Sequence, residues 1–362
     1  MTMERGFFPA KLVCPRCRVP GPDGRLIVSH LVPTADGTDG QVADRCASCG
    51  TCYPRIEGIR CVPPNLESFR EVQANALDSE WICLDRNGAL DACRRASDLD
   101  PTSDTFREVI FLALHALAHF PDATGLLGLE LECNRILLST VRTWLERTPW
   151  PENTPARCIL EAGCGPGALL QTVAPLFAGG ALGLDVRIAA LRLARRMAER
   201  GEAVVPFCLE GRRFEPLHLK ASEGSKPPAG SIHLVSGDIL APPLEAEAFP
   251  VVVALSLLDT VPDPLFALGQ LDALLAPGGL LLLGTPYSWD AKVVAPQEWW
   301  SGPNCMGSET LRLALAGRNP VLPHLRFEIL EETDRLAWAI PGHGRLVFRF
   351  FLDTLLARKC TS

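Results

Sequence analysis

The stretch Cys158-Ile-Leu-Glu161-Ala-Gly163-Cys-Gly165-Pro-Gly167 decides the fold of this chain. An apolar run ends in an acid and breaks into three glycines at alternate positions, and an apolar helical pattern follows over 168–173. Glycine has no Cβ and takes positive φ, so a ligand can approach the backbone closely there. Strand, glycine turn and helix start together predict a nucleotide-type pocket at a strand end. The alternative is a turn that only lets the helix pack on the strand.

The spacing of the glycines separates two kinds of nucleotide site. A dinucleotide fingerprint has the form G-x-G-x-x-G, whereas this chain has G-x-G-x-G after an acid. The latter form resembles the first motif of class I S-adenosylmethionine (SAM) methyltransferases. The resemblance implies that the amino-acid part of SAM lies over Gly163, Cys164, Gly165 and Gly167, with Glu161 near its ammonium group.

Three further motifs follow in the order that this family has. Asp185 ends the next apolar run, 18 residues after Gly167, where a carboxylate can accept hydrogen bonds from both ribose hydroxyls. The resemblance implies that Val186 follows at the ribose, that Asp238 and Ile239 contact adenine, and that Ser256 lies beside the methyl-transfer centre.

From residue 157 onward, strand and helix patterns alternate, as a doubly wound parallel sheet requires. The predicted fold class is α/β: a Rossmann-like class I methyltransferase sheet, mostly parallel. An antiparallel edge hairpin is predicted from 327–331 and 346–356, and the polar segment 212–228 is predicted to be an inserted loop. Strands are expected at Cys158–Glu161, Ala181–Asp185, His233–Ser236, Val251–Ser256 and Leu280–Gly284, and helices at Arg187–Arg200 and Pro264–Leu275.

Composition divides the chain of 362 residues into three segments. Residues 1–64 are rich in Cys, Gly and Pro and are expected to form a zinc ribbon. Residues 65–155 carry helical patterns, chiefly at 106–119 and 129–144, and are expected to form a helical cap. Residues 156–362 are expected to form the SAM-binding domain. No apolar run approaches a bilayer span and no secretory segment is visible, so a cytoplasmic protein without a membrane partner is expected.

Cysteine spacing predicts a metal site in the first segment. Cys14-Pro-Arg-Cys17 and Cys46-Ala-Ser-Cys49 are two C-x-x-C turns separated by 28 residues, and four thiolates suit structural Zn²⁺. Cys52 extends the second turn to C-x-x-C-x-x-C, so an iron–sulfur cluster is the competing interpretation.

The stretch from Cys49 to Arg60, with its Tyr-Pro-Arg-Ile-Glu-Gly-Ile sequence, resembles the small zinc-binding partner proteins of tRNA, rRNA and release-factor methyltransferases. The resemblance implies a stabilising or docking module fused to the catalytic part. Docking on RNA is therefore an alternative function. It is not favoured, because the net charge of −7 comes with no Lys/Arg-dense stripe.

The segments after the fourth and fifth predicted strands bear on the identity of the methyl acceptor. Nucleobase and glutamine N-methyltransferases carry Asn/Asp-Pro-Pro-aromatic at the fourth strand tip, and residues 255–260 here lack it. The pattern Thr-Pro-Tyr287-Ser-Trp289, followed by Trp299, resembles the domain that N-methylates thiolated histidine in ovothiol biosynthesis. The resemblance implies a small imidazole or amino-acid-like acceptor bound by these three aromatic residues. Alternatively, they pack a loop onto the sheet.

A proton acceptor is needed only if the nucleophile arrives protonated, because the sulfonium of SAM is already activated. Candidates are Asp259, His115, His119, His343 and Tyr287. His115 and His119 are four residues apart and share one helix face, where buried hydrogen-bonding roles are the alternative. The sequence thus predicts a SAM-dependent methyltransferase of a small-molecule acceptor. An RNA methyltransferase and a non-catalytic SAM-fold binding module are the other hypotheses.

Overall fold

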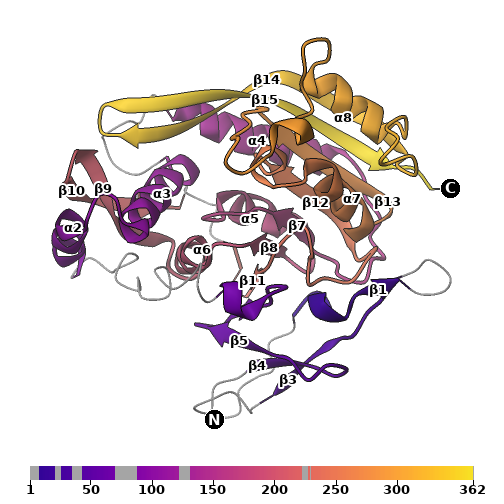
Figure 1. Cartoon of the computed structure of the whole chain (residues 1–362), viewed down its shortest axis with the longest axis horizontal. Coiled ribbons are helices and arrows are strands. Elements are labelled where there is room, and N and C mark those ends of the chain that lie inside the picture. Colours follow the sequence, from indigo (N-terminus) through magenta and orange to yellow (C-terminus); the bar gives the residue numbers. More distant parts are fainter. Residues whose placement is uncertain are drawn as a thin grey trace.

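In the computed structural model, described over residues 8–20, 26–34, 43–69, 88–121, 131–221, 227–228 and 230–361, one eleven-stranded sheet runs through the molecule (Figure 1). Its strand order is β14-β15-β13-β12-β7-β8-β11-β6-β5-β4-β3. The five strands predicted from the sequence form its parallel centre: β7 (Ile159–Ala162), β8 (Ala181–Asp185), β11 (Ile232–Ser236), β12 (Phe249–Leu255) and β13 (Leu275–Thr285). The predicted fold class is confirmed.

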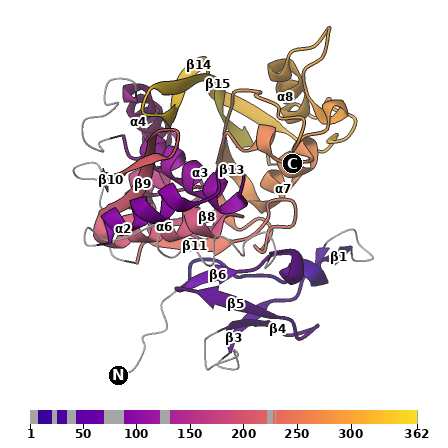
Figure 2. The ribbon, with the colours of Figure 1, turned by 60° about the vertical axis from the view of Figure 1, so that its left-hand side comes forward.

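Alternate residues of the central strands enter two separate hydrophobic cores. Ile159 and Val251 belong to one core, and their neighbours Leu160 and Val252 belong to the other. Both faces of a parallel sheet are covered, so its strands are apolar throughout. The first core lies under α5 (Ala168–Val173), η4 (Ala174–Leu176) and α6 (Ile188–Arg200), and the second under α7 (Pro264–Leu274) and α8 (Gly307–Leu315), on the opposite side in Figure 2.

The prediction of a loop at 212–228 is wrong for most of the described residues in this range. β9 (Glu202–Glu210) and β10 (Arg213–Lys220) form an antiparallel hairpin beside α2 (Ala89–Asp98). Phe214, Leu217 and Leu219 are buried, and polar or charged residues between them hid the apolar positions from a composition-based prediction. Residues 222–226 and 229 lie outside the described residues.

The predicted helical cap and edge hairpin lie together. α3 (Asp104–His119) and α4 (Glu132–Arg147) pack against the long antiparallel hairpin of β14 (Phe327–His343) and β15 (Leu346–Lys359). The hairpin is confirmed and is longer than predicted. Residues 129–130 of the predicted second cap helix lie outside the described residues.

Asn134 connects these parts. Its Nδ2 donates to the carbonyls of Ala118 (2.8 Å) and Ala339 (2.7 Å), and its Oδ1 accepts from the Ala339 N–H (2.7 Å). One fully buried amide thereby joins the end of α3, the start of α4 and the middle of β14.

The N-terminal segment extends the sheet instead of standing apart from it. β6 pairs in parallel with β11, so the strands within residues 31–61, β6, β5, β4 and β3, continue the sheet beyond its parallel centre (Figures 1 and 2). Its elements are η1 (Pro15–Cys17), β1 (Val19–Pro20), β2 (Leu26–Ile27), β3 (Leu31–Thr34), β4 (Ala43–Cys46), β5 (Cys52–Ile56) and β6 (Ile59–Cys61). Among the described residues, no helix combines the length and apolar character needed to span a membrane.

Replacing Asn134 tests the connection between cap and hairpin. Asn134→Ala leaves three buried backbone groups without partners, so we expect the free energy of unfolding to fall by about 1–3 kcal/mol. Urea denaturation measures this fall. Ser139→Ala, on the exposed face of the same helix, is the matched control and should change it by less than about 0.5 kcal/mol. Equal effects of the two variants would contradict the assigned role.

Candidate active site

The glycine turn lies at the carboxyl end of β7. Gly163, Gly165 and Gly167 have φ angles of 74°, 50° and 81°, in the left-handed region that glycine adopts without strain. A Cβ on Gly163 would lie 3.0 Å from Leu257 Cδ1, and a Cβ on Gly165 would lie 3.3 Å from His119 Nε2. The turn therefore requires glycine for its backbone conformation and also for space.

Asp185 ties this turn to the next strand. Its Oδ2 accepts the Gly165 N–H at 2.8 Å, and its Oδ1 accepts the Arg187 N–H at 2.8 Å. Burial raises the pKa of this carboxyl, while the backbone hydrogen bonds act in the opposite direction. The carboxylate fixes the tips of β7 and β8 relative to one another.

A cavity of about 480 Å³ opens above these strand ends. This volume lies within the range of about 300–1,000 Å³ that is usual for small-molecule sites. Eight of the predicted donor-binding residues line it: Glu161, Gly163, Gly165, Asp185, Val186, Asp238, Ile239 and Ser256. Cys164 and Gly167, also predicted, do not. The Cys164 side chain is fully buried, and Gly167 precedes α5, where a Cβ on it would lie 3.0 Å from Ala194 Cβ.

Residues of α3, α4, β14 and β15 form the cover of the cavity, and most of them were not predicted from the sequence. Besides the predicted His115 and His119, α3 contributes Phe111, and β14 contributes Trp338. The spacing of four residues from Phe111 to His115 to His119 was a usable signal, because it places all three on one helix face. Nothing local in the sequence marks the other contributors, Leu137, Leu138, Ile340 and Leu352.

Acidic side chains dominate the polar lining. Glu161, Asp185, Asp238, Asp259 and Asp290 all line the cavity. Arg187 is the one Lys or Arg among the described lining residues, and it pairs with Glu108 at 2.7 Å and stacks over the Phe111 ring at 3.8 Å. Burial lowers the pKa of His115 to about 4 and that of His119 to about 3, so both rings are neutral near pH 7. The cavity suits a ligand that carries positive charge.

Asp259 lines this cavity and has one oxygen without a hydrogen-bond partner among the described residues. It lies in η5 (Leu258–Thr260) and is 2% exposed; its Oδ2 accepts the Ser288 N–H at 2.9 Å. Its Oδ1 is buried without a hydrogen-bond partner among the described residues, and burial raises the pKa of the carboxyl. Ser256, three residues earlier, has a φ of 50°, a conformation that costs energy outside glycine. An unpaired buried carboxylate oxygen at a strained strand tip indicates a ligand-binding position.

The family comparison agrees with this geometry. Residues 134–320 match the model of a family described as a methyltransferase domain. The chain belongs to this methyltransferase family. It is a SAM-dependent methyltransferase, and SAM is its methyl donor.

Several solved structures are similar to the methyltransferase at low sequence identity. A SAM-dependent methyltransferase from Methanosarcina mazei is 19% identical, with a TM-score of 0.37, over 57% of this chain and 93% of that one. Magnesium protoporphyrin IX methyltransferase from Synechocystis is 16% identical, with a TM-score of 0.36, over 75% and 90%. The CurJ carbon methyltransferase is 14% identical, with a TM-score of 0.43, over 82% and 69%. No curated protein matches the chain.

The aromatic residues predicted to bind the acceptor do not line the cavity of the methyltransferase. The Tyr287 hydroxyl donates to Asp353 at 2.7 Å, and the Trp299 Nε1–H donates to the Val294 carbonyl at 2.9 Å. Trp289 and Tyr287 pack against Trp300 with ring centroids 5.9 and 6.5 Å apart. Their contacts are those of a loop packed onto the sheet.

Among the predicted proton acceptors, the structure brings Asp259, His115 and His119 to one cavity. Tyr287 is held in the aromatic cluster instead. His343 ends β14 at the hairpin turn, where its Nδ1 accepts the Arg345 N–H at 3.2 Å, and it does not line the cavity.

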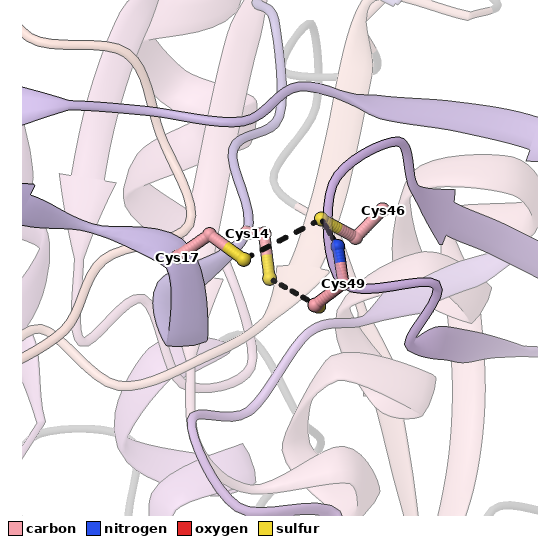
Figure 3. A group of neighbouring side chains, drawn as sticks. All are labelled: Cys14, Cys17, Cys46 and Cys49. Carbon is pink, nitrogen blue, oxygen red and sulfur yellow. Dashed lines mark hydrogen bonds between the residues drawn. The ribbon is translucent and has the colours of Figure 1, made fainter.

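The four cysteines predicted to bind metal converge (Figure 3). All four sulfur atoms of Cys14, Cys17, Cys46 and Cys49 lie within 4.8 Å of one another. The Cys14–Cys49 and Cys17–Cys46 sulfurs are 3.8 and 3.7 Å apart, and a tetrahedral ion with Zn–S bonds of about 2.3 Å needs about 3.8 Å. Cys52, on which the iron–sulfur interpretation depended, is exposed and is not part of the group.

Hydroxyl groups surround this cysteine group. The oxygens of Tyr53, Ser29 and Thr51 lie 3.2, 3.2 and 3.1 Å from the sulfurs of Cys14, Cys46 and Cys49, respectively. Such outer hydrogen bonds orient ligands and offset the charge of thiolates. The donor set therefore fits a structural Zn²⁺ ion.

Proposed function

We propose that the methyltransferase binds SAM in the cavity above β7, β8 and β11 and transfers its methyl group to a small nitrogen-containing acceptor. Eight residues predicted from donor-binding motifs line this one cavity, which supports the donor position. Asp259 carries the acceptor proposal, because it lines the same cavity and its buried Oδ1 has no hydrogen-bond partner among the described residues.

Bound SAM supplies an activated sulfonium methyl group, so the protein mainly aligns the two reactants and excludes water. The glycine turn permits close approach to the backbone, and Glu161 offers an unpartnered buried oxygen to a cationic group. Phe111, Trp338 and Leu352 close the opposite wall and lower the local dielectric.

On the acceptor side, Ser288 fixes one oxygen of Asp259 and leaves the other available to an N–H of the acceptor. A carboxylate in this position holds an imidazole or amine nitrogen and takes up its proton as the methyl group is transferred. Further acidic lining from Asp290 favours a cationic or hydrogen-bond-donating acceptor over an anionic one such as RNA.

Methyl-labelled SAM tests the acceptor class. We expect cell extract incubated with the enzyme to yield a labelled imidazole- or amine-bearing metabolite by mass spectrometry. Label recovered in RNA would overturn the small-molecule proposal, and the absence of any labelled product would favour a binding module.

Asp185→Ala tests the donor site. The variant loses both hydrogen bonds that hold the strand tips, so we expect calorimetry to show at least a tenfold loss of affinity for SAM. Asp98→Ala, at an exposed position of α2, is the control and should bind as the unmodified enzyme does. Unchanged affinity in Asp185→Ala would remove this cavity as the donor site.

Asp259→Asn tests the proton acceptor. Burial raises the pKa of Asp259, so turnover should be low where the carboxyl is protonated and should rise as the pH increases through this raised pKa. The Asn variant should lose about 10²–10⁴-fold in kcat together with this rise, and calorimetric affinity for SAM should stay unchanged. A variant that keeps both kcat and the pH profile would exclude the role.

We also propose that the four cysteines hold Zn²⁺ and that this site braces the adenine end of the cavity. Val13 donates to the Pro243 carbonyl at 3.0 Å, and Arg18 donates to the Pro242 carbonyl at 2.9 Å. These two residues flank the first C-x-x-C turn and contact the loop that follows Asp238 and Ile239. Zinc would therefore stabilise the fold and the donor pocket together, and no catalytic step needs it.

Cys46→Ser tests the metal site, with Cys52→Ser as the matched control. We expect one zinc per chain by elemental analysis in the unmodified protein and in Cys52→Ser, and a large loss in Cys46→Ser, because three thiolates and a hydroxyl bind zinc weakly. The melting temperature of Cys46→Ser should fall in parallel. Iron in place of zinc, or equal loss in both variants, would contradict the assignment.

A further inference from the structure

The ring of His119 is fixed by a hydrogen bond on one side. Its Nδ1 accepts the Ala168 N–H at 3.4 Å, at the start of α5 where backbone N–H groups have no partner within the helix. The edge of the ring meets Trp338 at a centroid distance of 5.5 Å and an angle of 84°. Because Nδ1 accepts a hydrogen bond and burial keeps the ring neutral, the proton of the imidazole resides on Nε2.

The Nε2–H of His119 lies over the glycine turn. A Cβ placed on Gly165 would be 3.3 Å from Nε2, and both residues line the cavity. Nε2 has no hydrogen-bond partner within the described part of the chain, because the one bond of the ring is that to Ala168. A fixed donor therefore faces the position where the glycine turn admits a ligand.

The turn itself has no backbone donor to offer. Pro166 lacks an N–H, and every other N–H from Gly163 to Ala168 already has an acceptor: Gly163 and Cys164 donate to the Leu184 carbonyl, Gly165 to Asp185, Gly167 to the Cys164 carbonyl, and Ala168 to His119. Arg187, the one Lys or Arg that lines the cavity in the described part of the chain, is paired with Glu108. Within residues 163–168 an anionic group therefore finds no unengaged backbone N–H, and the Nε2–H of His119 lies over this turn.

We infer that His119 donates its Nε2–H to the carboxylate of the amino-acid part of SAM, as a positioning residue. This assignment rests on the proposed donor site. An amino acid carries its ammonium and carboxylate on one carbon, and Glu161, the residue predicted to lie near the ammonium group, lines the same cavity as His119. The inferred role replaces that of an acceptor-side base, which was predicted for His119. With Nδ1 bonded to the Ala168 N–H and Nε2–H bonded to the carboxylate, the neutral ring has no nitrogen left to accept a proton from the nucleophile.

Two substitutions separate the two nitrogens of the ring. His119→Asn keeps an acceptor near the Nδ1 position and removes the Nε2–H, whereas His119→Gln keeps an amide donor near the Nε2 position. The probes are S-adenosylhomocysteine, which carries the carboxylate, and 5′-methylthioadenosine, which lacks the amino-acid group. Calorimetry on the full chain measures both affinities for each variant.

We expect His119→Asn to lose about 10- to 100-fold in affinity for S-adenosylhomocysteine and to bind 5′-methylthioadenosine as before, because the lost hydrogen bond is to a charged group. His119→Gln should recover most of the loss. Equal weakening of both ligands in His119→Asn would show a merely structural role and overturn the inference, as would unchanged affinity for S-adenosylhomocysteine. If the unmodified protein binds neither ligand, the donor site itself fails.

Discussion

The carboxylate of Asp185 is the constraint on which the site depends. Glycines at 163, 165 and 167 let the backbone turn sharply after β7, but the same freedom leaves the turn without a preferred conformation. By accepting the Gly165 and Arg187 N–H groups, Asp185 fixes the turn against the tip of β8. These hydrogen bonds offset part of the cost of burying the charge. The residue predicted to bind ribose therefore also shapes the pocket.

The two ends of this pocket are braced by parts of the chain that are distant in sequence. Asn134 holds α3, α4 and β14 together above the glycine turn. At the other end, β6 pairs with β11, and the Val62 N–H donates to the Ser236 carbonyl at 2.7 Å, beside Asp238. The loops that line the cavity are thus held by buried hydrogen bonds to neighbouring helices and strands.

The sequence predicted those features that depend on short segments. The run from Ala181 to Asp185 is an apolar strand ending in an acid, and both facts are local. β10 escaped prediction because Phe214, Leu217 and Leu219 alternate imperfectly with polar residues, and β10 packs against elements distant in sequence, α2 and α3, as well as against β9. Trp338 lies about 170 residues from the glycine turn, and only the pairing of β14 with β15 and the packing of α3 bring it there.

The floor and the cover of the cavity come from different parts of the chain. The family match covers residues 134–320 and contains the strand tips that line the floor of the cavity. The cover includes Phe111, His115 and His119, which precede the matched range, and Trp338, Ile340 and Leu352, which follow it. The floor residues belong to the donor motifs, which this chain shares in form with the family. In the proposed function, the cover would contact the parts of the bound molecules that lie away from the donor motifs, and the cap and the hairpin would therefore take part in selecting the acceptor.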